Sequence, residues 1–303
     1  MSRLRANALL LLAAIVWGTT FVVQQVGTGG LEAITFTGVR MLVGTVFILP
    51  AALVQLRKIN GSSRPFQISD WVGIFFTGMS LFVAAALQQQ GIFFTTVTNA
   101  SFLTVLYVPL VPVISLLVLR RRSHWSVWPA AVCSVIGTYI MTGVQQLNLQ
   151  VGDLFVIGSS LFWAIQVILV GRFAVRTGAP LVVACGQFLV CGVIGTIAGM
   201  IIEQPVLADF SGALLGILYA GLFSVGVGFT LQVVAQRHTH EADAAIILSS
   251  ETVFAACAGF IFLGERLSLS QTLGALLILT GILAVQLLPK QYGQARPLDP
   301  VSR

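Results

Sequence analysis

Ten uninterrupted apolar stretches, each about 20 residues long, constrain this chain more than any other feature of its sequence. A helix needs about 20 apolar residues to cross the roughly 30 Å hydrocarbon core of a membrane. Transmembrane β-strands are excluded because these stretches are about twice as long as a tilted strand. We therefore predict an all-α, polytopic membrane protein with ten transmembrane helices. The predicted spans are Ala6–Val26, Ala33–Gln55, Trp71–Gly91, Thr98–Leu119, Trp125–Val144, Asp153–Phe173, Ala179–Ile202, Ala213–Val234, Asp243–Leu263 and Gln271–Leu288.

The composition supports this class and excludes others. Hydrophobic residues make up 57% of the chain and charged residues only 9%, against about 25% charged residues in an average soluble protein. So few charges cannot cover a water-facing surface, which excludes a soluble globular protein, a disordered chain and a nucleic-acid-binding protein. The four cysteines lie in apolar runs without paired spacing, so we expect buried thiols rather than disulfides.

The basic residues predict the orientation in the membrane. If the ten spans are correct, 14 of the 16 Lys and Arg residues fall on one side, Arg266 falls on the other, and Arg40 lies inside a span. The positive-inside rule assigns the basic side to the cytoplasm, together with both termini. We expect a bacterial-type plasma (inner) membrane protein, in which the basic loops orient the chain and account for its net charge of +6.

The sequence also repeats internally. Asn99–Tyr107 aligns with Asp243–Glu251 at an offset of 144 residues, and Trp17 aligns with Trp163 at an offset of 146. Each half contains five predicted helices, and an odd number forces the second half to enter the membrane from the opposite face. We therefore predict two inverted repeats, residues 1–147 and 148–289, followed by a polar cytoplasmic tail, residues 290–303. Inverted repeats with a site at their interface are typical of secondary transporters.

Four motifs resemble the EamA branch of the drug/metabolite transporter (DMT) superfamily over residues 6–288. They are Trp17-Gly-Thr-Thr-Phe21 in the first span, Arg40 in the second, and Ser250-Glu-Thr-Val-Phe-Ala-Ala256 with Leu263-Gly-Glu-Arg266 in the ninth. The resemblance implies a ten-helix inverted-repeat transporter of small metabolites, with YddG-type amino-acid exporters as the members to compare. The first half departs from the pattern, because Tyr107 and Val108 replace its usual polar start and Arg120-Arg121-Arg122 replaces its Gly-Glu ending.

Two charged residues, Arg40 and Glu251, stand out because they lie well inside predicted spans, where charges are costly and are functional candidates by default. Glu251 is a candidate proton-coupling or amine-binding carboxylate. Arg40 lies at a depth that differs from that of Glu251 by under about 10 Å. The alternative is that the two form a structural pair or that each bonds the backbone at a broken helix.

Aromatic and amide side chains complete the candidate substrate site. Trp17, Tyr107 and Trp163 lie near the middle of their spans, although Trp and Tyr usually prefer the membrane interfaces, so we expect them to line a cavity. Gln24 and Gln166 would offer hydrogen bonds to a substrate. The alternative for these residues is helix packing and interhelical hydrogen bonding. Other glutamines, among them Gln89 and Gln232, are expected near helix ends, where water satisfies them.

Two further features carry weaker expectations. Pro109 and Pro112 should kink the fourth span, because proline removes a backbone donor. The segment from His238 to Asp243 has metal-ligand residue types but lacks the helical His-Glu-x-x-His spacing, so we expect a solvated loop and no metal site.

These features predict a secondary transporter that exports amino acids, including aromatic ones, by alternating access. No phosphate-binding Walker motif is present, so the energy would come from a gradient, with protons as a candidate coupling ion. The alternative is a channel or facilitator for other small polar metabolites. We predict no catalytic residues and no cofactor, because the spans contain no histidine and no nucleophile–base pattern. The expected partners are a small-molecule substrate and the lipid bilayer.

Overall fold

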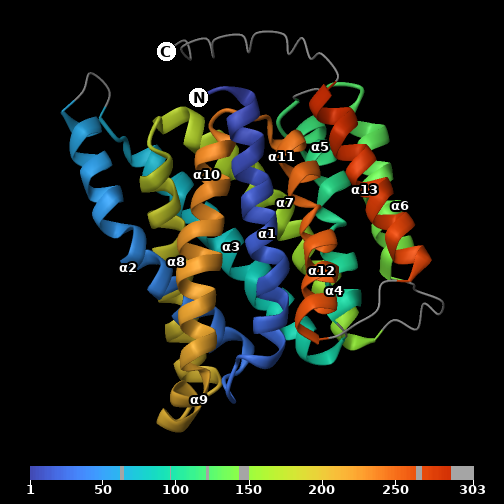
Figure 1. Cartoon of the computed structure of the whole chain (residues 1–303). Coiled ribbons are helices and arrows are strands. Elements are labelled where there is room, and N and C mark those ends of the chain that lie inside the picture. Colours follow the sequence, from blue (N-terminus) through green and yellow to red (C-terminus); the bar gives the residue numbers. More distant parts are fainter. Residues whose placement is uncertain (62–64, 96, 121–122, 143–149, 264–267, 288–303) are drawn as a thin grey trace.

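The described part of the chain is built from helices, without strands (Figure 1). The computed structural model describes residues 1–61, 65–95, 97–120, 123–142, 150–263 and 268–287. The helices are α1 (Arg3–Val26), α2 (Ala33–Asn60), α3 (Ile68–Phe94), α4 (Val97–Thr104), α5 (Tyr107–Leu117), α6 (Val127–Thr142), α7 (Val151–Thr177), α8 (Pro180–Ile202), α9 (Leu207–Tyr219), the π-helix η1 (Ala220–Phe229), α10 (Thr230–Gln236), α11 (Glu241–Leu248), α12 (Glu251–Leu263) and α13 (Leu269–Leu287).

The predicted count of ten transmembrane helices is confirmed, although three of them consist of several pieces. The fourth span is α4 with α5, the eighth is α9, η1 and α10 in one continuous run, and the ninth is α11 with α12. Six helical stretches of the described chain are long and apolar enough to cross a membrane by themselves. The remaining spans are made of shorter apolar helices.

Several helices extend beyond the ends of the predicted apolar spans. α1 begins at Arg3, and α2 continues past Gln55 to Asn60. A helical ladder ends where its backbone groups are capped, and this can lie beyond the edge of the apolar run. The predicted ends at Val144 and Leu288, like the tail 290–303, lie outside the described residues.

The fourth and ninth spans break at equivalent places in the two repeats. The first break is at Val105 and Leu106, and the offset of 144 residues relates it to the second, at Ser249 and Ser250. Pro109 explains the first break, because it lacks the N–H that a helix would donate to Val105 O, and Val108 N donates there instead at 2.9 Å.

The second break has no proline. The hydroxyls of Ser249 and Ser250 each donate at 2.7 Å to the carbonyls of Ile246 and Ile247 respectively. Such local side-chain bonds compete with the backbone ladder of a helix. Two different local causes therefore produce the same discontinuity in each half.

A side chain near the end of α2 caps the start of α8, and a side chain after α8 caps the start of α2. Glu203 follows α8, and its carboxylate accepts hydrogen bonds from the backbone of Ile34 and Thr35 at 2.8 and 2.7 Å. Gln55 in α2 accepts from the backbone of Leu181 and Val182 at 2.8 and 3.3 Å. Each helix therefore satisfies orphan N–H groups at the start of the other, which requires an antiparallel pair.

Glycine allows these two helices to approach closely. A Cβ atom added to Gly38 of α2 would lie 2.2 Å from Thr196 N and 2.5 Å from Gly195 C of α8. Small residues that bring backbones together are a common means of helix association in membranes.

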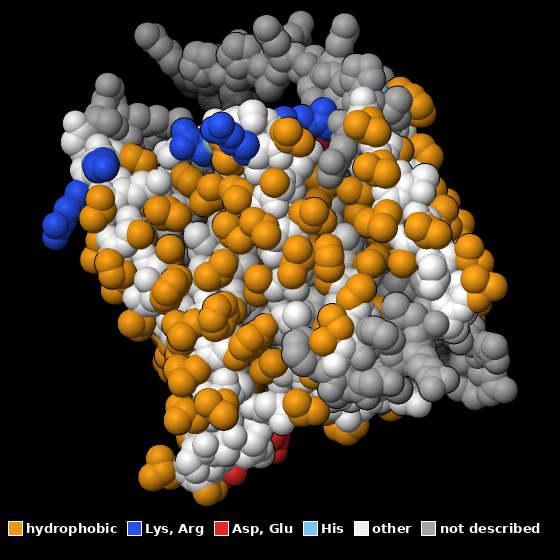
Figure 2. Space-filling model, viewed as in Figure 1, with side chains coloured by type: hydrophobic (Ala, Val, Ile, Leu, Met, Phe, Trp, Pro, Cys, Tyr) orange, Lys and Arg blue, Asp and Glu red, His pale blue; other side chains and the backbone are white. Residues whose placement is uncertain are grey.

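The halves run in opposite directions through the molecule. α1 starts at the upper end of Figure 1, whereas α7 ends there, since Arg176 of α7 pairs with Asp70 at the start of α3 at 2.7 Å. α13 also ends at the upper end. Lys and Arg side chains gather at that end, acidic side chains appear at the lower end, and hydrophobic side chains cover the belt between them (Figure 2). We call these the basic end and the acidic end.

The cysteines fit the expectation only in part. All four are free; Cys185 and Cys191 are buried, Cys133 is half-buried, and Cys257 is exposed. In a membrane-spanning helix, an exposed side chain faces lipid as readily as water. Burial of Cys257 was therefore a wrong prediction, because apolar surroundings in the sequence do not distinguish the protein core from the lipid face.

Candidate functional site

A cavity between the two halves contains all six predicted substrate-binding residues. Trp17 and Gln24 reach it from α1, Trp163 and Gln166 from α7, while Tyr107 begins α5 and Glu251 begins α12. Arg40 of α2 lines it as well. Sequence reasoning did not single out most of the remaining lining residues, which are Thr20, Phe21, Gln88, Thr104, Val167, Ser224, Phe229, Gln232 and Leu248.

The cavity is too small in this conformation for a metabolite. Its volume is about 50 Å³, which is room for a few water molecules. Gln24, Tyr107, Gln166 and Glu251 are all buried. A metabolite of amino-acid size can therefore enter only if the surrounding helices move apart.

Phe229 is the aromatic centre of the site. Its ring lies 4.6 Å from that of Trp17 and 5.8 Å from that of Trp163, centroid to centroid, the latter pair being stacked at 14°. The two tryptophans, which are equivalent by the repeat, thus flank one ring. Phe229 sits in an apolar run with nothing in the sequence to mark it, so only the packing of η1 reveals its role.

The two tryptophans differ in their hydrogen bonds. Trp17 Nε1 donates to the carbonyl of Ser224 at 3.3 Å, and Ser224 lies in the π-helix η1. The indole N–H of Trp163 is buried and has no hydrogen-bond acceptor among the described residues. π-Helical turns occur frequently at functional sites, and here the turn supplies an acceptor on one side of the cavity only.

Glutamines form a chain behind the aromatic group. Gln232 donates to Gln166 at 3.2 Å, and Gln166 donates to Gln187 at 3.1 Å. Gln89 is buried and donates to Gln24 O at 3.0 Å. Gln89 and Gln232 lie near the ends of α3 and α10 as expected, but the expectation that water satisfies them is wrong: both are buried, and buried amides need protein partners.

The Arg40 guanidinium and the Glu251 carboxyl group do not form an ion pair with each other. Arg40 donates to Gln24 Oε1 at 2.8 Å, its guanidinium carbon lies 5.5 Å from the centre of the Phe36 ring, and its Nε has no hydrogen-bond partner among the described residues. The ion pairs seen in the described part of the chain do not include Arg40 or Glu251. A guanidinium and a carboxyl group therefore line the same cavity without contacting each other as an ion pair.

The helix breaks position two of these groups. Glu251 is the first residue of α12, where a carboxylate is favoured by the helix dipole. Tyr107 is the first residue of α5, and its hydroxyl donates to Ala245 O of α11 at 3.3 Å. The repeat offset of 144 residues relates the two positions. Both half-helices thus begin at the cavity.

The segment from His238 to Asp243 is not the solvated loop that we expected. Asp243 is only 1% exposed, and Glu241, the first residue of α11, accepts a hydrogen bond from Ser115 Oγ at 3.2 Å. Across the described residues, no three His, Cys, Asp or Glu side chains come together as metal ligands. The motif Gly264-Glu265-Arg266 lies outside the described residues.

Comparison with known proteins agrees with this architecture. The EamA-like transporter family matches residues 4–143 and again residues 150–287. The chain is 28% identical to an uncharacterized transporter of Archaeoglobus fulgidus, over 95% of this chain and 87% of that protein. It is 27% identical to the uncharacterized transporter YwfM of Bacillus subtilis, over 94% and 95% of the two chains.

A solved structure has the same fold. A protein known by its crystal structure superposes with a TM-score of 0.76, over 94% of this chain and 98% of that one, at 17% identity. None of these relatives is named for a substrate, so similarity to YddG-type exporters stays a prediction. The family match covers both halves of the described fold, and the chain belongs to the EamA-like transporter family.

Proposed function

We propose that this membrane transporter is a secondary carrier that exports amino acids, aromatic ones included, across the inner membrane by alternating access. The observation that carries the proposal is a buried guanidinium, Arg40, and a buried carboxyl group, Glu251, that line one cavity without pairing with each other. An isolated charge in a low-dielectric interior is costly. A ligand that carries both signs would compensate both groups at once.

The proposed contacts follow from the chemistry of a zwitterion. The Arg40 guanidinium would bind the α-carboxylate, since it has an unused N–H and is well suited to carboxylates. Glu251 would bind the α-ammonium group. Trp17, Phe229 and Trp163 would contact an aromatic or apolar side chain.

Proton coupling would use the same carboxylate. A carboxyl group that faces only a small cavity can hold either a proton or an ammonium group, but not both. Exchange of one for the other would couple the proton gradient to substrate release. Repeats 1–147 and 148–289 would move relative to each other around this central site.

The orientation is part of the proposal. Lys and Arg side chains gather at one end of the molecule (Figure 2), which favours the cytoplasm for that end and for both termini. Export would then begin at the basic end and finish at the acidic end.

Counterflow of labelled amino acids in proteoliposomes, with and without a pH gradient, tests this function. We expect saturable exchange that the gradient stimulates, and Glu251→Gln should abolish the stimulation while the protein stays folded. Glu32→Gln is the matched control, because Glu32 is exposed and makes no side-chain cap bond to α2. Lack of exchange across a broad amino-acid panel would refute the substrate class, and non-saturable flux without counterflow would favour the channel or facilitator.

A further inference from the structure

We propose that two small hydrogen-bonded contacts, related by the internal repeat, are the gates that close the cavity from its two sides. The basic-end latch consists of Asn7 with Thr239, together with Arg3 and Asp243. The acidic-end latch consists of Thr95 with Asp153. The inference rests on the alternating access proposed above and assigns the residues that control it, but it does not depend on the identity of the substrate.

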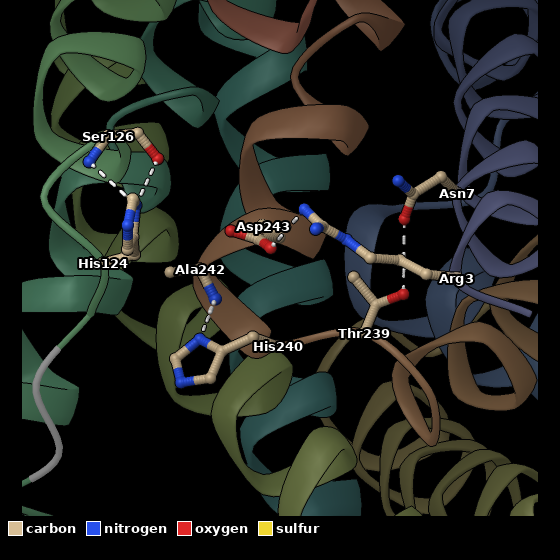
Figure 3. Close-up of polar contacts among 8 residues, drawn as sticks. All are labelled: Arg3, Asn7, His124, Ser126, Thr239, His240, Ala242 and Asp243. Carbon is tan, nitrogen blue, oxygen red and sulfur yellow. Dashed lines mark hydrogen bonds and ion pairs between the residues drawn. The ribbon is translucent and has the colours of Figure 1, made fainter. Parts of the chain in front are cut away.

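The basic-end latch joins the start of α1 to the start of α11 (Figure 3). Thr239 Oγ1 donates to Asn7 Oδ1 at 3.4 Å, and Arg3 Nη2 pairs with Asp243 Oδ2 at 3.3 Å. Asp243 is 1% exposed, whereas Arg3 is 35% exposed. The side chains of α1 therefore reach across to α11 at the point where the chain meets the basic end.

The acidic-end latch makes the corresponding contact in the other half. Thr95 Oγ1 donates to Asp153 Oδ1 at 2.5 Å, while the second carboxylate oxygen of Asp153 accepts from Gln150 N at 2.9 Å. It joins the start of α7 to Thr95, which follows α3 and stands two residues before α4.

The Asn7–Thr239 contact and the Thr95–Asp153 contact are equivalent by the offsets that the sequence already contains, whereas the Arg3–Asp243 pair belongs to the basic-end latch alone. An offset of 146 residues takes Asn7 to Asp153, as it takes Trp17 to Trp163. An offset of 144 takes Thr95 to Thr239, as it takes the first helix break to the second. A pair of chance surface contacts would not obey both offsets at once, so the contacts reflect the pseudo-symmetry of the transporter.

Each latch lies at the outer end of a half-helix. Thr239 stands two residues before α11 and Thr95 two residues before α4. Each half-helix ends at a break, so it can tilt while its continuation, α12 or α5, stays at the cavity. Release of one latch would thus open one side without disturbing the other.

Apolar side chains complete the seal at the basic end. Leu10 of α1 and Ala244 and Ile247 of α11 are fully buried in one cluster between the latch and the cavity. With both latches formed, the cavity holds only about 50 Å³. Opening of either latch would enlarge the cavity toward one end of the molecule.

The test measures access to the cavity directly. A Thr20→Cys reporter faces the cavity in a chain whose four native cysteines are replaced by Ala, and a membrane-impermeant maleimide is applied to cells or to inverted vesicles. We expect Thr239→Val to increase the labelling rate about five-fold from one side, and Thr95→Val to increase it about five-fold from the opposite side. Adding Asp243→Asn to Thr239→Val should increase labelling further from the same side.

The controls keep the outcome interpretable. Thr77→Val removes a buried hydroxyl that donates only within α3, to Gly73 O at 2.8 Å, and should leave labelling from both sides unchanged. Each variant is accepted only if it elutes as the parent protein and retains its thermal transition. Increased labelling from the same side in both latch variants, or in neither, would overturn the gate assignment.

The gate assignment and the proposed substrate class can be refuted independently of each other. Opposite-sided labelling without amino-acid counterflow would retain the latches and refute the substrate class. Counterflow in the parent protein with unchanged labelling in both latch variants would retain the carrier and refute the latches.

Discussion

The repeat-related tryptophans give the sharpest prediction, because they share a ring neighbour but differ in one hydrogen bond. Trp163→Phe and Trp17→Phe each retain an aromatic ring beside Phe229 and remove an indole N–H. In Trp17 that N–H donates to Ser224 O, whereas in Trp163 it has no acceptor among the described residues. The two substitutions should therefore have opposite effects.

The magnitudes follow from the hydrogen bonds. A typical hydrogen bond contributes about 1 kcal/mol net to stability, and an unsatisfied buried donor costs about 1–3 kcal/mol. Trp17→Phe should then destabilise the substrate-free protein by about 1 kcal/mol, and Trp163→Phe should stabilise it by about 1 kcal/mol. For a chain of this length, each corresponds to about 2 °C in Tm.

For substrate binding, Trp163→Phe should be the more harmful of the two substitutions. If the Trp163 N–H is reserved for a substrate acceptor, its loss should raise the half-saturation concentration for amino-acid counterflow about ten-fold, the equivalent of about 1.4 kcal/mol. Trp17→Phe should change it by less than about two-fold, because that N–H is already used. Thermal unfolding of the substrate-free protein and counterflow in proteoliposomes measure the two effects.

One result would refute the reasoning directly. If Trp163→Phe lowers the Tm of the substrate-free protein as much as Trp17→Phe does, its indole N–H is satisfied without substrate. If stability behaves as predicted but half-saturation is unchanged, Trp163 packs against Phe229 without contacting the substrate.

Three further predictions concern charge recognition and packing. Arg40→Lys should raise the half-saturation concentration about ten-fold, because a lysine cannot bond Gln24 and a carboxylate in the same planar arrangement; an unchanged value would place the carboxylate elsewhere. Glu203→Ala should lower stability by about 2 kcal/mol and Gln55→Ala by about 1 kcal/mol, since the carboxylate cap is charge-assisted; thermal unfolding in detergent compares them. Gly38→Leu should prevent the close α2–α8 contact and cost at least about 3 kcal/mol, and a folded variant of parental Tm would contradict the packing described.

The sequence by itself determined the membrane class, the number of spans and seven of the residues that line the candidate site. Continuous apolar runs of spanning length have few other structural solutions, because every backbone polar group in lipid must be satisfied within the element. The sequence identified Arg40 and Glu251 because charged side chains are costly inside such runs. It identified Trp17 and Trp163 because tryptophan usually prefers the membrane interfaces.

Only the tertiary structure decided how these residues are used. Phe229 is one of many phenylalanines in the sequence, and its place between two tryptophans depends on the π-helix η1. The burial of Gln232 and Asp243 likewise depends on neighbours from distant helices. Periodicity and composition indicate whether a segment is surrounded by water, lipid or protein. A hydrogen-bond partner or a ring contact depends instead on the packing of helices far apart in the chain, which local sequence patterns do not encode.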